Sequence, residues 1–251
     1  MMTERDDKNV GAYSFKVEPF HADFKGRLTL GVLGNYLLNC AGFHAAERGF
    51  GIASLNEHHY TWVLSRLAME MTDYPVQYET FTIQTWVENV YRLFTDRNFE
   101  LLDQAGNPIG YVRSVWAMID LDSRKPVDLL NMHEGHILDY VCDKACPIEK
   151  PGRVKVAAGL EPVQVREARY SDIDINGHVN SVKYIEHILD LFPIELFERK
   201  RISRFEIAYV AECRYGDQLS FYVEEHGPDD YHVEIRKNGT EVVVRSKVKF
   251  N

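Results

Sequence analysis

Side chains able to move a proton or attack a carbonyl gather in two short segments of the second half of the chain. The first segment, SDIDINGHVN, holds Asp172, Asp174, Asn176, His178 and Asn180. The second segment, YVAECRYGD, holds Glu212 and Cys213. A histidine with a carboxylate can take a proton from water, and a cysteine beside a histidine can act as a nucleophile. If the two segments meet in space, they would make a hydrolytic site.

The first segment is suited to placing an imidazole at the start of a helix. Gly177 breaks the local pattern just before an apolar helix, which Asn180 or Ser181 can cap. Backbone N–H groups at a helix N-terminus carry partial positive charge, so they can receive an oxyanion and keep His178 neutral. Glu212 and Cys213 close a strand that is expected to run beside this helix, so we expect both to meet His178.

Each of these residues also has a plain structural interpretation. A run of Asp and Asn before a helix is typical of a turn and cap. Glu212 taken alone suits a solvated strand end, and Cys213 taken alone suits a small buried side chain. Their joint occurrence favours a site.

An internal repeat organises the chain. A shift of 138 residues aligns Leu64–Leu67 with Ile202–Phe205, and the alternating strand YETFTIQTWVE with GDQLSFYVEE. Other blocks align Arg113 with Arg245, by a shift of 132, and Tyr36 with Tyr184, by a shift of 148. Short alternating strands can resemble one another by chance, but three blocks agree in order, which favours a duplication.

The repeat predicts an α+β fold made of two similar domains. Each half reads as a strand near Tyr13 or Val163, one helix, and about four alternating strands of a curved antiparallel sheet. The apolar helix positions are Leu33, Tyr36, Leu37, Cys40 and Phe43 in the first half, and Val182, Ile185, Ile188, Leu189 and Phe192 in the second, before Pro193. An apolar helix must be buried, so each sheet is expected to wrap around its helix, with 120–156 as a connector.

The chemistry is predicted to occur once, although the fold occurs twice. The shift of 148 takes the polar positions Asp174, Asn176, His178 and Asn180 to Gly26, Leu28, Leu30 and Val32. The shift of 138 takes Glu212 and Cys213 to Tyr74 and Pro75. Side chains needed only for the fold should recur in both copies, so this contrast predicts one active site per chain.

Composition excludes several other classes. A formal net charge of −9 disfavours a general nucleic-acid binder, and no apolar stretch is long enough to span a bilayer. The start of the chain lacks the order of a secretory signal. The four cysteines are too sparse for a disulfide framework, which favours a reduced cytoplasm.

No metal and no cofactor are expected. The spacing of a metal site is not found in His133, His136, Cys142 and Cys146, and the sequence has no nucleotide-binding fingerprint.

The stretch D-I-N-G-H-V-N-S-V-K-Y-I, from Asp174 to Ile185, resembles the D-x-N-x-H-V-N-N-V-K-Y motif of plant-type acyl-acyl carrier protein (acyl-ACP) thioesterases. Glu212-Cys213-Arg214 is similar to the E-C motif of that family, and the resemblance runs from about residue 13 to residue 250. Two features depart from the family pattern: Ser181 replaces the second Asn, and Tyr209-Val210-Ala211 replaces a basic run.

The resemblance implies two tandem hot-dog domains, each a curved antiparallel sheet around one long helix. The expected division is a tail at 1–12, an N-terminal domain at 13–135, a linker at 136–160 and a catalytic C-terminal domain at 161–251. The implied activity is hydrolysis of fatty acyl thioesters carried on ACP, in fatty acid biosynthesis. The catalytic set carried over by motif is Asp174, Asn176, His178, Glu212 and Cys213.

Within that resemblance, several alternatives stay open. Water could be activated by Glu212 and His178, with Asp174 orienting the imidazole, or Cys213 could be the nucleophile. Acyl-CoA could replace acyl-ACP as substrate, or the chain could bind acyl thioesters without turnover. The two domains of one chain can satisfy each other as a pseudo-dimer, so a monomer and a homodimer are both compatible with the predicted fold. A bacterial cytoplasm is expected because no transit peptide is seen.

Two further expectations concern the substrate and its carrier. The resemblance implies an acyl tunnel mainly in the first domain. Two interpretations stay open for Met69, Met71, Trp86, Trp116 and Met118: they shape the depth of the tunnel, or all five belong to the core. An acidic carrier protein would need a local basic patch on this acidic chain, for which the candidates are Arg199, Lys200, Arg201 and Arg204.

Overall fold

The computed structural model describes residues 8–251, with only the backbone described at 133–135. The chain divides into two compact units. The first unit comprises the residues up to Leu67 together with Thr72–Lys150, and the second comprises Ala68–Met71 with Pro151–Asn251. The division at Lys150 and Pro151 falls inside the segment expected to be a linker. No helix among the described residues is long and apolar enough to cross a membrane.

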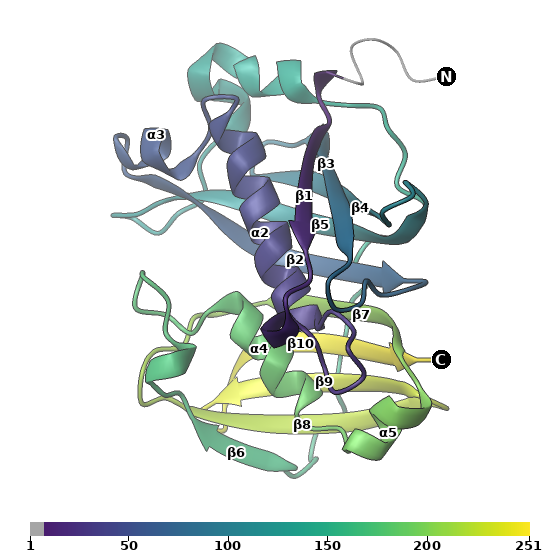
Figure 1. Ribbon diagram of the computed structural model, residues 1–251. Coiled ribbons are helices and arrows are strands. Elements are labelled where there is room, and N and C mark those ends of the chain that lie inside the picture. The colour runs from purple at the N-terminus through teal and green to yellow at the C-terminus, as the bar shows by residue number, and fades with distance from the viewer. Residues whose placement is uncertain (1–7) are drawn as a thin grey trace. The chain divides into compact units, whose positions relative to one another are not determined.

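The first unit is an antiparallel sheet with one long helix lying against it (Figure 1). Its strands are β1 (Gly11–Lys16), β2 (Tyr60–Met71), β3 (Thr80–Val90), β4 (Phe94–Leu102) and β5 (Pro108–Asp120). Its helices are η1 (Pro19–His21), α2 (Leu30–Ala46), α3 (Ile52–Asn56) and η2 (Leu129–Tyr140). The strand order is β1-β3-β4-β5-β2. Strand β1 begins at Gly11, so two residues that we placed in the N-terminal tail belong to the sheet.

The second unit repeats this arrangement (Figure 1). Its strands are β6 (Gln164–Glu167), β7 (Ile202–Tyr209), β8 (Gln218–Gly227), β9 (Asp230–Lys237) and β10 (Glu241–Phe250). Its helices are η3 (Tyr170–Asp172), α4 (Ser181–Leu189) and α5 (Ile194–Arg199). The strand order β6-β8-β9-β10-β7 is that of the first unit with each strand replaced by its repeat partner. The predicted tandem hot-dog architecture is therefore confirmed.

The two long helices bury the faces that the sequence predicts, with differences at their C-terminal ends. In α2, Leu33, Leu37 and Cys40 are buried, but Phe43 is 50% exposed and His44 is buried. The prediction that Phe43 is buried is therefore wrong. In the second unit, α4 ends at Leu189 rather than just before Pro193. Phe192 then packs from the following turn against Phe250, with ring centroids 5.3 Å apart.

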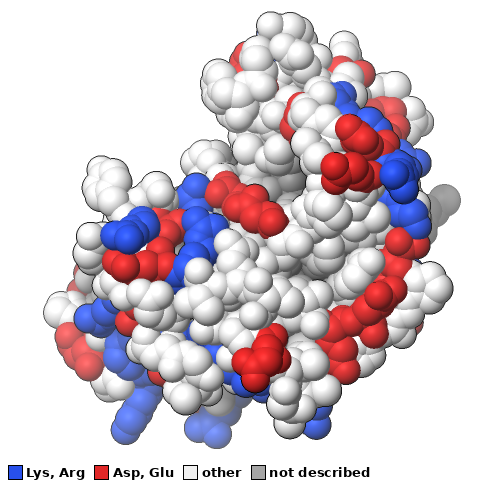
Figure 2. Space-filling view, turned by 90° about the horizontal axis from the view of Figure 1, so that it is seen from below, with Lys and Arg blue, Asp and Glu red and all other residues white. Residues whose placement is uncertain are grey.

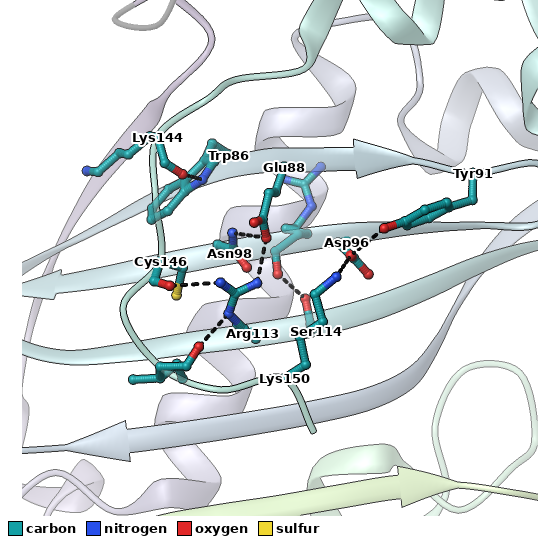
Figure 3. A network of polar contacts seen from close by, with 12 residues as sticks. Trp86, Glu88, Tyr91, Asp96, Asn98, Arg113, Ser114, Lys144, Cys146 and Lys150 are labelled. Carbon is teal, nitrogen blue, oxygen red and sulfur yellow. Dashed lines mark hydrogen bonds and ion pairs between the residues drawn. The ribbon is translucent and has the colours of Figure 1, made fainter. Parts of the chain in front are cut away.

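The segment that follows η2 is packed against the outer face of the first unit's sheet (Figure 3). Arg113 of β5 donates to the carbonyls of Ile148 and Cys146, each at 2.7 Å, and its Nη1 lies 2.6 Å from Glu88 Oε2. Trp86 Nε1 donates to the carbonyl of Lys144 at 2.8 Å. Residues 142–148 therefore act as a strap that closes this face, with Cys142, Cys146 and Ile148 covering Trp86.

We expect Arg113→Met to lower the free energy of unfolding by about 2 to 4 kcal/mol. The change removes the ion-pair partner of the mostly buried Glu88 carboxylate, which keeps a hydrogen bond from Asn98, and it removes the Arg113 hydrogen bonds to two strap carbonyls; loss of one partner of a buried pair is costly. Denaturant unfolding would measure it. Arg66→Met, on an exposed position of β2, is the matched control and should change stability by less than about 0.5 kcal/mol. Equal effects of the two substitutions would contradict the role of the strap contacts.

Candidate active site

A tight loop before α4 presents the histidine of the motif. Asp174 Oδ1 accepts hydrogen bonds from the amides of Asn176, at 2.8 Å, and His178, at 3.1 Å. The Gly177 amide donates to the Asp174 carbonyl at 3.1 Å, and Gly177 has a φ of 79°, which glycine adopts without steric cost. Asn180 then caps α4 by accepting from the Val182 amide at 2.9 Å. The predicted cap is confirmed.

His178 meets Glu212, as expected from the sequence. Glu212 lies in the loop between β7 and β8. The Nε2 atom of His178 lies 3.2 Å from its Oε2 atom. The two loops are joined beside this pair by a hydrogen bond from the Val179 amide to the Cys213 carbonyl, at 2.8 Å. The His178 side chain is 19% exposed and the Glu212 side chain 46%. The pair is therefore held by backbone contacts yet remains open to water and to a substrate.

Cys213 is placed differently from the other candidates. Its side chain is fully buried, beside Tyr184 of α4. Burial raises the pKa of its thiol, so the thiolate is disfavoured. A buried thiol with a raised pKa is a poor nucleophile, which favours activated water over Cys213 as the attacking group.

The helix N-terminus offers fewer free amides than we expected. The Val182 amide is taken by the Asn180 side chain, and the Lys183 amide donates to the Asn180 carbonyl at 2.9 Å. The Asn176 side chain, by contrast, is exposed at the tip of the loop.

The same loop exists in the first unit, at a register that differs from the one we predicted. Asp23 Oδ1 accepts hydrogen bonds from the amides of Lys25 and Arg27, at 2.8 and 3.0 Å. Gly26 occupies the position in this loop that Gly177 occupies in the other, also with a positive φ. The matching hydrogen bonds align Asp174 with Asp23, a shift of 151. The predicted partners Gly26, Leu28 and Leu30, from a shift of 148, are therefore wrong. The error is three residues, close to one helical turn, which leaves the apolar positions of a helix nearly in register.

The corrected register shows which side chains of the loop have a counterpart in the first unit and which do not. Asp174 makes the same backbone contacts as Asp23, so its carboxylate holds the turn of this loop. Lys25 and Arg27 occupy the places of Asn176 and His178, and Arg27 is tied to Asp23 Oδ2 at 2.8 Å. The side chains present in the second unit alone are those of Asn176, His178, Glu212 and Cys213.

A cluster of hydrogen-bonded polar side chains, Asp172, His187 and Arg166, lies beneath the loop. Asp172 was a candidate from the sequence, whereas the other two were not. Asp172 is 3% exposed; its Oδ1 accepts from His187 Nε2 at 2.9 Å, and its carbonyl accepts from the Asn180 amide at 2.8 Å. Arg166 donates to His187 Nδ1 at 2.8 Å. Burial and the Arg166 charge lower the pKa of His187, which stays neutral. A histidine on the buried face of the predicted helix, between Ile185 and Ile188, was the signal that could have revealed this group.

The other candidates of the sequence do not form a site. No cluster able to hold a metal ion occurs among the residues that the structure describes. Cys142 and Cys146 pack against Trp86, and the exposed His136 lies 3.0 Å from Asp139. The side chain of His133 lies outside the described residues.

A cavity of about 240 Å³ lies inside the first unit, between α2 and the sheet. Of the five residues expected to shape an acyl tunnel, Trp116 contributes to its wall. Trp86 lies under the strap, and Met118 packs with Leu55 and Leu129. Met69 and Met71 are buried in the part of β2 that groups with the second unit. The other four do not line this cavity, and their part in shaping an acyl tunnel stays a prediction.

Comparisons with known proteins agree with this arrangement. The profile of the acyl-ACP thioesterase N-terminal domain matches residues 8–133, and that of the C-terminal domain matches residues 161–251. A solved acyl-ACP thioesterase from Bacteroides thetaiotaomicron is 64% identical, with a TM-score of 0.93 over 98% of this chain and 99% of that one. The 12:0-ACP thioesterase from Umbellularia californica, at 20% identity, shares the fold over 97% of each chain, with a TM-score of 0.84.

Curated plant relatives are longer than this chain. Oleoyl-acyl carrier protein thioesterase 2 from Arabidopsis thaliana, a chloroplastic protein, is 27% identical over 86% of this chain, which spans 63% of its length. The same family is indicated by both domain profiles, by the solved bacterial structure and by the motif in the loop before α4. The chain belongs to the acyl-ACP thioesterase family.

Proposed function

We propose that the protein hydrolyses fatty acyl-ACP thioesters to free fatty acid and holo-ACP, in fatty acid biosynthesis. The observation that carries the proposal is the contact of His178 Nε2 with Glu212 Oε2, at 3.2 Å, on a loop that bears the motif of the family. A histidine with a solvent-accessible carboxylate can activate water, and no cofactor is needed for hydrolysis.

In the proposed mechanism, water attacks the thioester carbonyl carbon. Glu212, held by His178, accepts a proton from that water as the new C–O bond forms. The C–S bond then breaks, and the departing phosphopantetheine sulfur takes the proton back from the Glu212 and His178 pair. Negative charge on the carbonyl oxygen is stabilised by the Asn176 side chain, because a donor aimed at the developing oxyanion lowers the barrier.

Asp174→Ala is expected to lower kcat/KM by roughly tenfold or more, because the loop that presents His178 loses the carboxylate that closes its turn. Asp23→Ala is the matched control: it removes the same turn contacts in the first unit, where no catalytic histidine is presented. Asp23→Ala also breaks the ion pair with Arg27, so it should lose at least as much stability in thermal unfolding as Asp174→Ala, while Asp174→Ala alone loses activity beyond its loss of stability. Equal activity of the two variants would contradict a positioning role.

Cys213→Ser is expected to retain at least about a tenth of wild-type turnover, because the buried, protonated thiol takes no part in bond formation. Mass spectrometry of the wild-type protein mixed with substrate checks the same point. An acyl group trapped on Cys213 would overturn the water mechanism in favour of an acyl-enzyme.

Charge on the protein surface bears on the carrier partner. Acidic and basic side chains gather in separate small clusters on the face in Figure 2, and neither sign covers that face. Of the candidate basic patch, Lys200 is ion-paired with Asp229, and Arg204 contacts Glu206 at 2.6 Å. Arg199 and Arg201 are exposed. Exposed basic side chains such as Arg199 are suited to meeting an acidic carrier.

The test of the proposed function is the release of free thiol from matched acyl-ACP and acyl-CoA substrates. We expect turnover of both, with a higher kcat/KM for acyl-ACP. A preference for acyl-CoA would make the protein an acyl-CoA thioesterase. Tight binding of acyl-ACP without thiol release would make it a non-catalytic acyl-thioester-binding protein.

We also propose that the protein acts in a bacterial cytoplasm, with no nucleic-acid or membrane partner, as a monomer or a homodimer. Its free thiols at Cys40, Cys142, Cys146 and Cys213 agree with a reducing compartment. Light scattering of the purified chain would decide between the two assembly states.

A further inference from the structure

The loop that presents His178 is a narrow hairpin with two stems. In residues 172–180, here called the His178 loop, the Asp172 carbonyl accepts from the Asn180 amide at 2.8 Å. Nearer the tip, the Asp174 amide donates to the His178 carbonyl, also at 2.8 Å. The Asn180 stem runs directly into α4, which fixes it. The Asp172 stem leaves from η3, a single turn, so a side-chain contact is needed to fix it as firmly.

His187 supplies that contact from the buried face of α4. Its Nε2 lies 2.9 Å from Asp172 Oδ1, and the Arg169 amide donates to Asp172 Oδ2 at 2.8 Å. Arg166 Nη1, which can only donate, lies 2.8 Å from His187 Nδ1, so Nδ1 accepts and Nε2 carries the proton that Asp172 receives. Arg166 is also 3.7 Å from Asp190, the C-cap of α4. The imidazole therefore links the Asp172 stem to the helix and to an arginine that is itself held by the helix.

The first unit builds the same corner from other side chains. The shift of 151 that aligns the two loops gives each member of this cluster a counterpart, and the counterparts of Arg166, Asp172 and His187 are Phe15, His21 and Tyr36. Tyr36 is therefore the partner of His187 rather than of Tyr184. The Tyr36 hydroxyl lies 3.0 Å from His21 Nδ1, and its ring packs on Phe15 with centroids 4.3 Å apart. The corner of the fold can thus be built without a carboxylate and without an arginine.

The set with the buried carboxylate occurs beneath the loop that carries His178. Asp172 is 3% exposed and His187 4%, whereas their first-unit counterparts are half-buried. Burying a carboxylate is costly unless its hydrogen bonds are met, and a displacement of about 1 Å at a reacting group can lower a rate about 100-fold. We propose that His187 is a positioning residue, which ties the Asp172 stem to α4 and so holds His178 at the Glu212 carboxylate. This inference rests on the hydrolysis proposed at His178.

Two substitutions of His187 test the proposal in steady-state thiol release from acyl-ACP. His187→Leu removes both ring contacts, whereas His187→Gln stays neutral and keeps one donor for Asp172 and one acceptor for Arg166. We expect His187→Leu to lower kcat about tenfold or more with KM within about threefold, because only the chemical step depends on the pose of His178. His187→Gln should keep kcat within about threefold of wild type. Tyr36→Phe, which removes the equivalent contact in the first unit, is the matched control and should leave kcat unchanged. Equal kcat values for the leucine and glutamine variants would overturn the proposal.

Hydrogen–deuterium exchange of the full chain, followed by mass spectrometry across the His178 loop, needs no turnover. We expect faster exchange in this loop for His187→Leu and wild-type exchange for His187→Gln. If His187→Leu does not fold, Arg166→Phe loosens the same imidazole from the half-exposed strand β6, where the first unit already carries Phe15, and the loop should again exchange faster. Wild-type exchange in the loop of the folded variant would overturn the proposal. A wild-type chain that releases no thiol would contradict the hydrolysis instead, so the two failures are distinguishable.

Discussion

His178→Ala is expected to lower kcat/KM for acyl-ACP hydrolysis by about 100-fold or more, the usual size of a lost general acid-base group. The imidazole Nε2 lies 3.2 Å from the Glu212 carboxylate, so its loss removes both the proton relay and this support of the carboxylate. The fold should persist, because the loop is held by Asp174 and by the Val179 contact with Cys213, both independent of the imidazole. Steady-state kinetics and circular dichroism of the purified variant would measure the two effects.

The second unit supplies a matched control for this substitution. His226 Nε2 lies 3.2 Å from Glu224 Oε2, the same separation as in the candidate site, and His226 is 41% exposed. His226→Ala therefore removes a similar pair at a place without the loop motif. Turnover within a few-fold of wild type is expected. If His178→Ala and His226→Ala behaved alike, the assignment of the active site would be wrong.

Glu212→Gln is expected to lower kcat by about 100-fold or more while keeping the hydrogen bond to His178. The amide has nearly the size of the carboxylate but cannot accept a proton from water, so the loss isolates the chemical step. The KM should change little, because the substrate meets a side chain of the same shape. Rapid-quench measurement of thiol release would separate the chemical step from product release.

Glu224→Gln is the control for this change, because Glu224 pairs with His226 at the same distance. The double variant His178→Ala with Glu212→Gln gives a sharper test. Two groups that act as one unit lose activity together, so the double variant should be little worse than the worse single variant. Multiplicative losses would show that His178 and Glu212 act in separate steps.

Much of the fold could be predicted from the sequence, because local patterns carry it. Alternation of apolar residues marks strands such as β3 and β8, and their similarity revealed the duplication. The cap at Asn180 and the break at Gly177 are local features as well, since each involves residues close in the chain. The contact between His178 and Glu212 was predicted by a longer route, from the repeat and from the resemblance to a family.

The register of the repeated loop and the role of Asp174 were decided by tertiary structure. Periodicity tolerates a slip of three residues along a helix, whereas hydrogen bonds do not, so only the matching contacts of Asp23 and Asp174 reveal the true alignment. That alignment shows that the Asp174 carboxylate holds the turn of its loop, as Asp23 does in the first unit.

The sequence by itself determined the fold class, the duplication and the two segments that meet at His178 and Glu212, because each depends on the order and spacing of neighbouring residues. Only the tertiary structure decided which apolar residues face the cavity, that the Cys213 thiol is buried, and that Arg97 and His44 meet inside the first unit. Alternating strand residues point to opposite faces of the sheet, and a pattern of types does not say what covers each face. The burial and charge balance of a side chain arise from partners far away in the chain, and these are known once the sheet has closed around its helix.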